Sequence, residues 1–289
     1  MIENVAVIGA GAMGAPMARR LRDAGFNLTI CDRSEEALDR LRGDGIACTT
    51  RAADCAGCDV VLILVATPAQ VRAVLSGEEG LRAGLAGRKP VVVVMSTISP
   101  AAMRELHDDL APQSITLLDA PVSGGDLKAR DGTLSIMVGG PRESFDALQP
   151  VWETLGSAVF HCGALGAGQA TKIVNNIIGI CNLMISAEAY GIALDSGLDL
   201  KAILPVLDES SGRNFFSRTP EMASAAYGAW ASSREGFASL QAIMRKDIAL
   251  AAEICDAADG LPMLRMLKDV LAGVDDETYR RWRRVAESG

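Results

Sequence analysis

Lys172 and Asn176 are the residues whose types and spacing most directly suggest chemistry. Because they lie four positions apart, their side chains point the same way if the segment is a helix. The run that follows, to about Leu194, is apolar on nearly every side, which is typical of a buried helix. An ammonium group at the start of such a helix is either a snorkelling side chain that caps the core or a proton-transferring group whose pKa is lowered by burial and by the helix dipole.

A glycine turn near the N-terminus predicts a dinucleotide-binding fold. A short β-branched run, 2–8, ends at Gly9, and Gly11 and Gly14 follow before a segment of helical character. The first glycine permits a tight turn, the second lets the backbone approach a pyrophosphate, and the third allows close packing of helix on strand. All three are candidate cofactor-binding residues, because strand, turn and helix come in the order that this fold requires.

An acidic residue follows the second predicted strand, 27–31. Asp32 lies 18 positions after Gly14, near where a carboxylate binds the adenosine ribose hydroxyls. Its charge repels a 2′-phosphate and favours NAD, whereas the guanidinium of Arg33 would accept that phosphate in NADP. A solvated Asp–Arg pair at a turn is the alternative without a cofactor. The sequence therefore predicts NAD, with NADP as the second choice.

Polar side chains follow two later strands. Thr97 comes after the buried strand 90–95, at the carboxyl end where open α/β sheets bind ligands, so it is a candidate nicotinamide contact or a simple helix cap. Further on, Ser123 precedes Gly124 and Gly125. Two glycines behind a serine expose backbone amides and a hydroxyl, which can hold a carboxylate without a charged side chain. A plain turn has the same composition.

The order of these patterns predicts an α/β protein of two domains. Strands alternate with helical segments up to about residue 162, and their wholly apolar runs suit a parallel sheet covered on both faces. Beyond it no strand pattern follows. Helices are expected at about 168–195, 200–208, 235–258 and 262–272. We predict a doubly wound Rossmann domain over 1–162 and an all-α domain over 163–289.

Polar groups in the C-terminal part are further candidates. Arg213 and Asn214 lie in a polar interruption, where they grip the distal end of a substrate or cap a helix. Phe237, Lys246 and Asp247 lie on the next predicted helix. Taken alone, the Lys–Asp dipeptide is typical of an ordinary exposed pair.

The charge and hydropathy patterns narrow the class of partner. The chain has 28 Lys and Arg residues against 36 Asp and Glu residues, a net charge of −8. Its dense basic run, Arg280–Arg284, is predicted to be the solvated face of a last helix, so nucleic-acid binding is not expected. Asn182, Ser186 and Glu188 interrupt the longest apolar run, so no membrane span is expected.

Cysteine and histidine usage predicts a chemistry without a metal. Seven scattered cysteines indicate reduced thiols in a cytoplasmic protein. Cys55 and Cys58 have the spacing of a redox motif but no second pair, so a redox or zinc role is not expected. The two histidines, His107 and His161, have no second ligand nearby in the sequence, which gives little support to a metal site or a catalytic triad.

Four stretches together resemble the β-hydroxyacid dehydrogenases, the family of 3-hydroxyisobutyrate dehydrogenase and tartronate semialdehyde reductase. They are Val7-Ile-Gly-Ala-Gly-Ala-Met-Gly14, Asp119-Ala-Pro-Val-Ser-Gly-Gly125 with Gly132-Thr-Leu134, Gly163-x-x-Gly-x-Gly-x-x-x-Lys172-x-x-Asn-Asn176, and Lys246-Asp-Ile-Ala-Leu250. The match covers nearly the whole chain. The second and third stretches are far more specific than the first.

The resemblance implies a long interdomain helix at about 168–195 and a helical domain that often builds the oligomer, so a homodimer or homotetramer is expected. It also implies roles for individual residues. Lys172 is implied as the general acid/base, and Asn176, Ser123, Gly124 and Gly125 as residues that hold the substrate. Thr97 and Lys246 are implied near the cofactor, Met13 within the cofactor-binding glycine motif, and Phe237 as a further substrate-site candidate. Asn214 is a substrate-site candidate from its polar segment alone.

The implied reaction is hydride transfer between a nicotinamide cofactor and a 3-hydroxy acid or its semialdehyde or keto form. The segments 211–216 and 226–230 match no substrate subgroup, so the acid itself is not predicted. Two alternatives remain. One is an imine reductase on the same scaffold, in which the family lysine is usually replaced. The other is a non-catalytic NAD(H)-binding interaction protein that keeps the fold.

Overall fold

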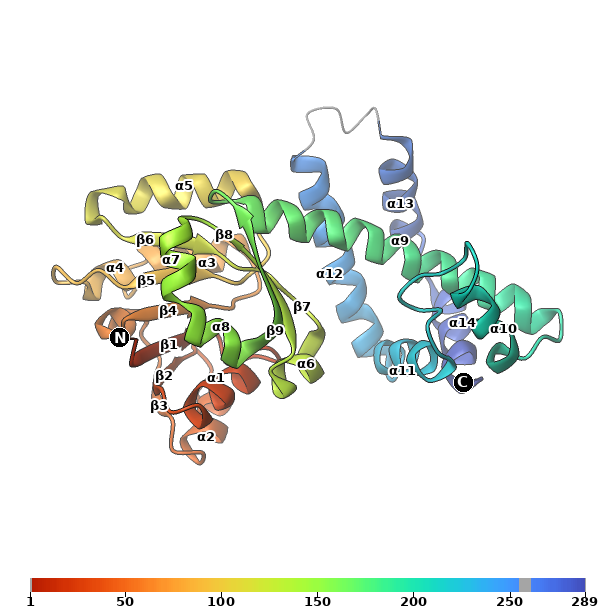
Figure 1. The fold of residues 1–289 in the computed structure, drawn as a ribbon, viewed down its shortest axis with the longest axis horizontal. Helices are drawn as coiled ribbons and strands as arrows, with labels where there is room; N and C mark the ends of the chain where they lie inside the picture. The colour runs from red at the N-terminus through yellow and green to blue at the C-terminus, as the bar shows by residue number, and fades with distance from the viewer. Residues whose placement is uncertain (1, 255–260, 289) are drawn as a thin grey trace. The chain divides into compact units, whose positions relative to one another are not determined.

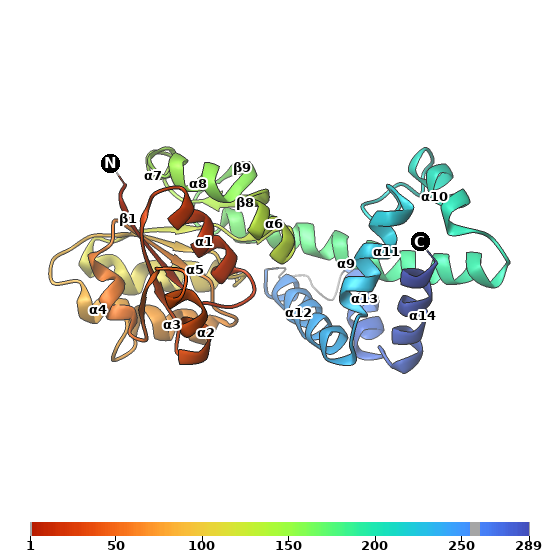
Figure 2. The same ribbon diagram turned by 90° about the horizontal axis from the view of Figure 1, so that it is seen from below.

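The computed structural model describes residues 2–254 and 261–288. Contacts between Cα atoms divide the chain into two compact units, Met1–Lys172 and Ile173–Gly289. The domain boundary predicted at 162/163 lies at the end of β9 (Gly156–Gly163), whereas the contacts divide the chain ten residues later, inside α9 (Ala167–Asp195). α9 is one continuous helix in both views (Figures 1 and 2).

The first unit is a sheet with helices on both faces (Figure 1). Its strand order is β3-β2-β1-β4-β5-β6-β8-β7, with β9 paired to β8. The pairs from β3 to β6 are parallel, and β8 runs antiparallel to β6 and β7. The strands are β1 (Asn4–Ile8), β2 (Asn27–Cys31), β3 (Ala47–Thr49), β4 (Val60–Ile63), β5 (Val91–Val94), β6 (Thr116–Asp119), β7 (Val122–Ser123), β8 (Leu134–Gly139) and β9. The predicted doubly wound Rossmann fold is confirmed.

Alternate residues of the central strands enter two separate hydrophobic cores. Val5 and Val7 of β1 pack with α1 (Gly14–Asp23), α2 (Glu35–Arg42) and α8 (Gln149–Leu155) on one face. Ala6 and Ile8 pack with α3 (Pro68–Ser76), α4 (Leu81–Gly84) and α5 (Pro100–Leu110) on the other. Because side chains alternate across a strand, burial on both faces explains the uninterrupted apolar runs. Shorter elements are η1 (Ala52–Gly57), η2 (Ala111–Gln113), α6 (Gly125–Asp131) and α7 (Arg142–Ala147).

One helix predicted in this unit is in fact two helices. The segment 143–155 forms two helices, α7 and α8, that meet at Leu148. Pro150 explains the break, because proline has no N–H to donate and its ring clashes with the carbonyl four residues earlier. The strand predicted before the Ser123 turn is likewise divided, into β6 and the short strand β7. Its two residues pair with β8 and are too few for a visible pattern.

The second unit is all helical within the part of the chain that the structure describes. Its elements after α9 are α10 (Leu200–Asp208), α11 (Pro220–Trp230), α12 (Arg234–Glu253), α13 (Pro262–Ala272) and α14 (Asp276–Glu287). The predicted helices at 168–195, 200–208 and 262–272 are confirmed. The helix predicted at 235–258 ends as α12 at Glu253, and residues 255–258 of that prediction lie outside the described residues.

Aromatic side chains build much of the core of this unit. Tyr190, Tyr227 and Trp282 are buried and stack edge to face along a row. The buried hydroxyls find backbone partners, since Tyr190 Oη donates to Phe216 O at 3.0 Å and Tyr227 Oη donates to Leu183 O at 2.7 Å. These bonds tie α11 and the preceding loop to α9. α11 itself was not predicted, because its Ala, Ser and Gly content leaves a weak apolar period.

The C-terminal basic run lies on a helix, as predicted. α14 buries Trp282, and three of the four arginines of the run, Arg281, Arg283 and Arg284, pair with carboxylates. Arg283 pairs with Glu287 at 2.7 Å and Arg284 with Asp195 at 2.7 Å. A basic run whose charges are mostly paired is a weak electrostatic footprint for nucleic acid.

By length and composition alone, α9 would be long and apolar enough to cross a membrane. We predicted no membrane span because polar residues interrupt this run. Few of its 29 residues are charged, however, so its mean hydropathy is still high enough for a span. Its residues Leu183, Met184, Ala187 and Tyr190 pack into the core of the second unit. We therefore interpret α9 as a core helix.

Candidate active site

The glycine turn after β1 leaves no space for side chains at its ends. Gly9 has φ +109°, and a Cβ there would lie 2.2 Å from Leu64 O. A Cβ on Gly14 would lie 1.8 Å from Gly9 O. Gly11 is different, because its Cβ would meet nothing within 4 Å. Its lack of a side chain is thus not required by the protein's own packing, and open space at this position suits a pyrophosphate.

A cavity of about 550 Å³ lies beside the turn, at the carboxyl ends of the parallel strands. Gly9, Asp32, Arg33 and Val65 are among its lining residues, together with residues of α3. Ligands bind at this edge of open α/β sheets. The residues present therefore fit the adenosine half of a dinucleotide.

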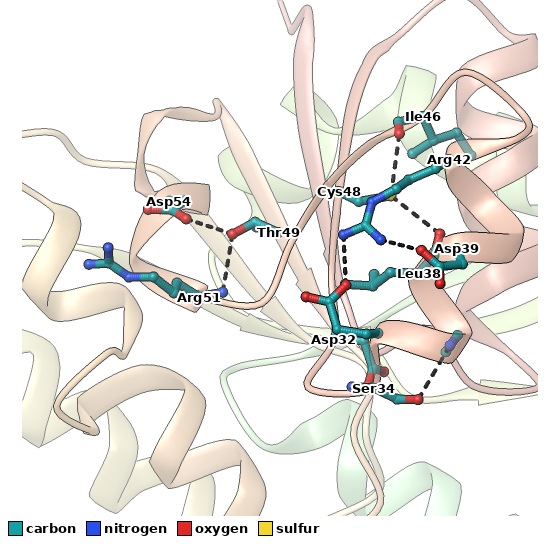
Figure 3. A network of polar contacts seen from close by, with 12 residues as sticks. Asp32, Ser34, Leu38, Asp39, Arg42, Ile46, Cys48, Thr49, Arg51 and Asp54 are labelled. Carbon is teal, nitrogen blue, oxygen red and sulfur yellow. Dashed lines mark hydrogen bonds and ion pairs between the residues drawn. The ribbon is translucent and has the colours of Figure 1, made fainter.

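Asp32 is held in place by the turn and by the start of α2. Its Oδ2 accepts from Ala10 N at 2.7 Å, and its Oδ1 accepts from Ser34 N at 2.8 Å. Figure 3 shows Asp32 beside Ser34, whose hydroxyl caps α2. Each carboxylate oxygen has a second lone pair, so both remain able to accept from ribose hydroxyls. Arg33 is exposed at the edge of the same cavity.

Two of the polar residues after β5 accept hydrogen bonds from backbone N–H groups. Ser96 Oγ accepts from Val65 N at 2.9 Å, and Ser99 caps α5 by accepting from Ala102 N at 3.2 Å, as its position before Pro100 predicted. Thr97 lies between them and is half-buried. Ser99, and not Thr97, therefore caps α5, and the ligand contact of Thr97 stays a prediction.

Ser123 and the two glycines after it form a sharp turn. Ser123 ends β7, paired with Ser135 of β8. Gly124 has φ +137° and Gly125 has φ +71°, conformations that other residues rarely adopt. A Cβ on Gly125 would meet nothing within 4 Å. The turn thus presents bare backbone beside the Ser123 hydroxyl, the arrangement expected for a carboxylate site.

The start of α9 is fastened to the sheet by a buried carboxylate. Asp119, the last residue of β6, is 0% exposed. Its Oδ1 accepts from Gly166 N at 2.6 Å and its Oδ2 accepts from Gln169 N at 2.7 Å. Burial raises the pKa of Asp119, while the N–H groups of Gly166 and Gln169 oppose the shift. Lys172, 8% exposed, lies three residues after Gln169 on the same helix.

In the second unit, Asn176 is held by a residue of α12. Asn176 Nδ2 donates to Asp247 Oδ2 at 2.7 Å. Lys246 Nζ lies 3.2 Å from Asp247 Oδ1, an ion pair whose geometry is not that of a hydrogen bond. Asp247 is 4% exposed, so the expectation of an ordinary exposed Lys–Asp pair is wrong. The buried Asp247 carboxylate accepts a hydrogen bond from the Asn176 amide on another helix.

Comparison with known proteins agrees with this geometry. A family model described as the NAD binding domain of 6-phosphogluconate dehydrogenase matches residues 4–163. A second, described as NAD-binding of NADP-dependent 3-hydroxyisobutyrate dehydrogenase, matches residues 166–282. The chain belongs to the β-hydroxyacid dehydrogenase family. The resemblance noted in the sequence is confirmed.

Individual members of this family cover most of the chain. A 3-hydroxyisobutyrate dehydrogenase of Pseudomonas aeruginosa is 39% identical over 213 residues, 73% of this chain and 71% of the relative. An NAD-dependent L-serine dehydrogenase of the same organism is 34% identical over 272 residues, 91% of this chain and 89% of the relative. A solved 3-hydroxyisobutyrate dehydrogenase of Mycobacterium tuberculosis with L-serine has a TM-score of 0.80 at 28% identity and covers 99% of each chain.

More distant structures share only the fold. An imine reductase from Myxococcus stipitatus is 19% identical, with a TM-score of 0.65 and coverage of 98% of this chain and 100% of that one. As a β-hydroxyacid dehydrogenase, the chain is an NAD(P)-dependent enzyme that acts on hydroxyl groups. Among the described residues, no group of three or more His, Cys, Asp or Glu side chains is placed to hold a metal ion.

Two candidate substrate residues of this dehydrogenase, Asn214 and Phe237, make contacts that stabilise the fold. Asn214 Nδ2 donates to Ser186 Oγ at 3.2 Å and to Gly212 O at 3.1 Å, while its Oδ1 accepts from Phe216 N at 2.7 Å. The amide thereby shapes the loop before α11, but it caps no helix, because the C-cap of α10 is Glu209 and Thr219 caps α11. Phe237 is buried and packs edge to face on Tyr279 and Trp282. A substrate contact from either residue stays a prediction.

Sequence reasoning assigned no role to three polar residues whose hydrogen bonds join α9 of this dehydrogenase to other elements. Asp119 and Gln169 connect α9 to the sheet, and Asp247 orients Asn176. A signal for Asp119 was present, because a carboxylate that ends a buried apolar strand has to find donors. No local pattern marks Gln169 or Asp247, since their partners lie 73 and 71 positions away.

Proposed function

We propose that the chain oxidises a 3-hydroxy acid with NAD, and that Lys172 accepts the hydroxyl proton as hydride leaves the carbon. The observation that supports this most directly is a buried lysine fixed on a helix whose start is tied to the cofactor-binding unit. General acid/base groups of this kind contribute about 10²–10⁴-fold to a rate. When bound, NAD supplies the hydride acceptor.

The substrate carboxylate is assigned to the Ser123 turn. Ser123 supplies a hydroxyl, and Gly124 and Gly125 supply backbone N–H groups at positive φ. All three lie in the same unit as the cofactor turn and Lys172. A carboxylate held here leaves the hydroxyl-bearing carbon of a 3-hydroxy acid free to reach Lys172 and the nicotinamide.

Asn176 is assigned an acceptor role by elimination. Because an ionised carboxylate only accepts hydrogen bonds, Asp247 must face the Nδ2 side of the Asn176 amide. The Oδ1 atom therefore points elsewhere, and it accepts from Asn175 Nδ2 at 3.2 Å. One turn from Lys172 on the same helix, its second lone pair is available to the lysine ammonium or to the substrate hydroxyl.

The preference for NAD rests on Asp32. Its carboxylate is fixed beside the adenosine cavity by two backbone donors, so it cannot swing away from a 2′-phosphate without breaking them. Like charges in that position disfavour NADP. Arg33 would have to compensate from its exposed position. We infer a cytoplasmic location from the scattered cysteines, and this stays a prediction.

Initial rates with a panel of acids test this function. The panel contains 3-hydroxyisobutyrate, glycerate, threonate and L-serine, each with NAD and NADP in parallel, and cyclic imines with NADPH as the opposing class. We expect reduction of NAD by at least one hydroxy acid, at least about tenfold faster than of NADP, which corresponds to 1.4 kcal/mol of discrimination. Imine reduction without alcohol oxidation would favour the imine reductase. Cofactor binding without any turnover would favour the non-catalytic protein.

We also propose that the chain forms a homodimer through α9. Its exposed side carries Ile178, Ile185 and Ile192 at intervals of seven residues, 58%, 60% and 68% exposed. Single exposed apolar residues are common, whereas a row of them along one side of a helix favours pairing with another apolar surface. A second copy of the same helix offers a complementary row.

Ile185→Lys tests this interface by placing a charge in the middle of the row. We expect wild-type protein to sediment as a dimer or larger at micromolar concentration and Ile185→Lys to shift towards monomer, with Kd raised at least about tenfold. Ile243→Lys, at a residue of α12 that is 53% exposed, is the matched control. A monomeric wild type, or an unchanged Kd in Ile185→Lys, would refute the interface.

A further inference from the structure

The helix that carries Lys172 reaches the sheet unusually closely. A Cβ on Gly168 would lie 2.2 Å from Met137 O, and a Cβ on Gly139 would lie 2.4 Å from Asp119 Oδ1. Both glycines are needed so that the first turn of α9 can sit against β8 and beside the Asp119 carboxylate. The glycine-rich stretch before Lys172 therefore allows the start of α9 to pack closely on the sheet, and we do not interpret it as a phosphate-binding loop.

Gln169 adds a second tie to the neighbouring strand. It is 0% exposed, its Oε1 accepts from Ile98 N at 3.1 Å, and its Nε2 donates to Ser96 O at 2.8 Å. These two backbone groups follow β5, on either side of Thr97. One side chain thus links the first turn of α9 to the segment that carries the predicted nicotinamide contact.

We propose that Asp119, together with the Gln169 side chain, is a positioning residue for Lys172: both fasten the start of its helix to the sheet. The two oxygens of Asp119 accept from the N–H groups of Gly166 and Gln169, and Gln169 lies one turn before the lysine. This fixes both the height and the rotation of the helix. The inference rests on the proposed role of Lys172 as the general acid/base.

Asp119 also acts on charge. Unpaired N–H groups give the start of a helix a partial positive charge, which anions stabilise. Asp119 supplies that anion from within the protein, so the start of α9 is not available to a substrate carboxylate. From the sequence, the dipole of this helix was expected to lower the pKa of Lys172. The Asp119 carboxylate opposes that dipole. Burial and the neighbouring groups are left to tune the lysine.

Asp119→Asn keeps the shape of the side chain and removes its charge. We expect Kd for NAD and KM for the hydroxy acid to change less than about threefold. Turnover should fall by about ten- to a hundredfold, because small misplacements of a catalytic group cost that much. The midpoint of the pH profile of kcat should move about one unit lower, because the variant lacks the carboxylate that offsets the dipole at the start of the helix carrying Lys172.

Asp59→Asn is the matched control. The Oδ2 of Asp59 likewise accepts from two backbone N–H groups, of Glu3 and Asn4, both at 2.9 Å. It lies at the amino end of β4, remote from Lys172 in the sheet. A purely structural loss of two such bonds would leave the pH midpoint unchanged in both variants, whereas we expect Asp119→Asn alone to move it. Equal pH profiles in both variants would overturn the proposal.

Gln169→Met decides the case if Asp119→Asn fails to fold. Methionine fills a similar volume and removes both bonds to the β5 segment without a change in charge. We expect kcat to fall at least about fivefold with an unchanged pH midpoint, and wild-type kcat would overturn the proposal. Failure of the proposed function looks different, because Lys172→Ala would then keep its turnover.

Discussion

Replacing Lys172 by alanine is expected to lower kcat at least about a hundredfold and to leave the Kd for NAD unchanged. The factor is the lower end of what a general acid/base contributes. Cofactor affinity should survive because the glycine turn, Asp32 and the adenosine cavity involve other residues of the unit. Steady-state rates measure kcat, and a calorimetric titration with NAD measures Kd separately.

Lys172→Arg distinguishes proton transfer from a fixed charge. Arginine keeps the positive charge but does not give up its proton in proteins. If the lysine accepts the substrate proton, this variant should be as slow as Lys172→Ala. Recovery of most of the turnover in Lys172→Arg would reduce the lysine to an electrostatic contact. Lys89→Ala, at an exposed lysine of the same unit, controls for the loss of a charge alone.

Alanine substitutions at Gly14 and Gly11 should separate folding from cofactor binding. In Gly14→Ala the new Cβ meets the backbone at Gly9 O, 1.8 Å away, so the turn has to open. We expect a loss of about 2–4 kcal/mol in the free energy of unfolding. In Gly11→Ala the Cβ enters open space, so stability should change by less than about 0.5 kcal/mol. Urea denaturation of both variants measures this difference.

The second half of this prediction concerns affinity. If the space beside Gly11 belongs to the pyrophosphate, Gly11→Ala should raise the Kd for NAD at least about tenfold, or 1.4 kcal/mol. Gly179→Ala is the control, since its Cβ also meets nothing within 4 Å and it lies in α9 after the division between the units. Unchanged affinity in Gly11→Ala would place the pyrophosphate elsewhere.

The fold was largely predictable because its signals are local. Apolar runs such as Val60–Ile63 predict buried parallel strands, and a capping residue such as Ser99 before Pro100 predicts where a helix begins. The errors lie where the signal is short or conflicting. β7 has two residues, and Pro150 divides a helix that apolar spacing alone joins.

The site was predictable only in part, because its organisation depends on long-range contacts. Lys172 and the glycines stand out by type and spacing. The partners of α9 do not, since Asp119 lies 47 and 50 positions from the amides that it accepts from. Asp247 was read as exposed because a Lys–Asp dipeptide on a helix usually is. A local pattern cannot show that a carboxylate faces an amide from another helix.

Chemical rescue of Lys172→Ala tests the central claim most directly. A small primary amine added to the variant can take the place of the missing lysine amine and accept the hydroxyl proton. We predict that the slow formation of NADH by Lys172→Ala rises with the concentration of unprotonated amine, while the wild-type rate stays the same. A variant that turns over within about tenfold of wild type, with no response to amine, would contradict the assignment of Lys172 as the general acid/base.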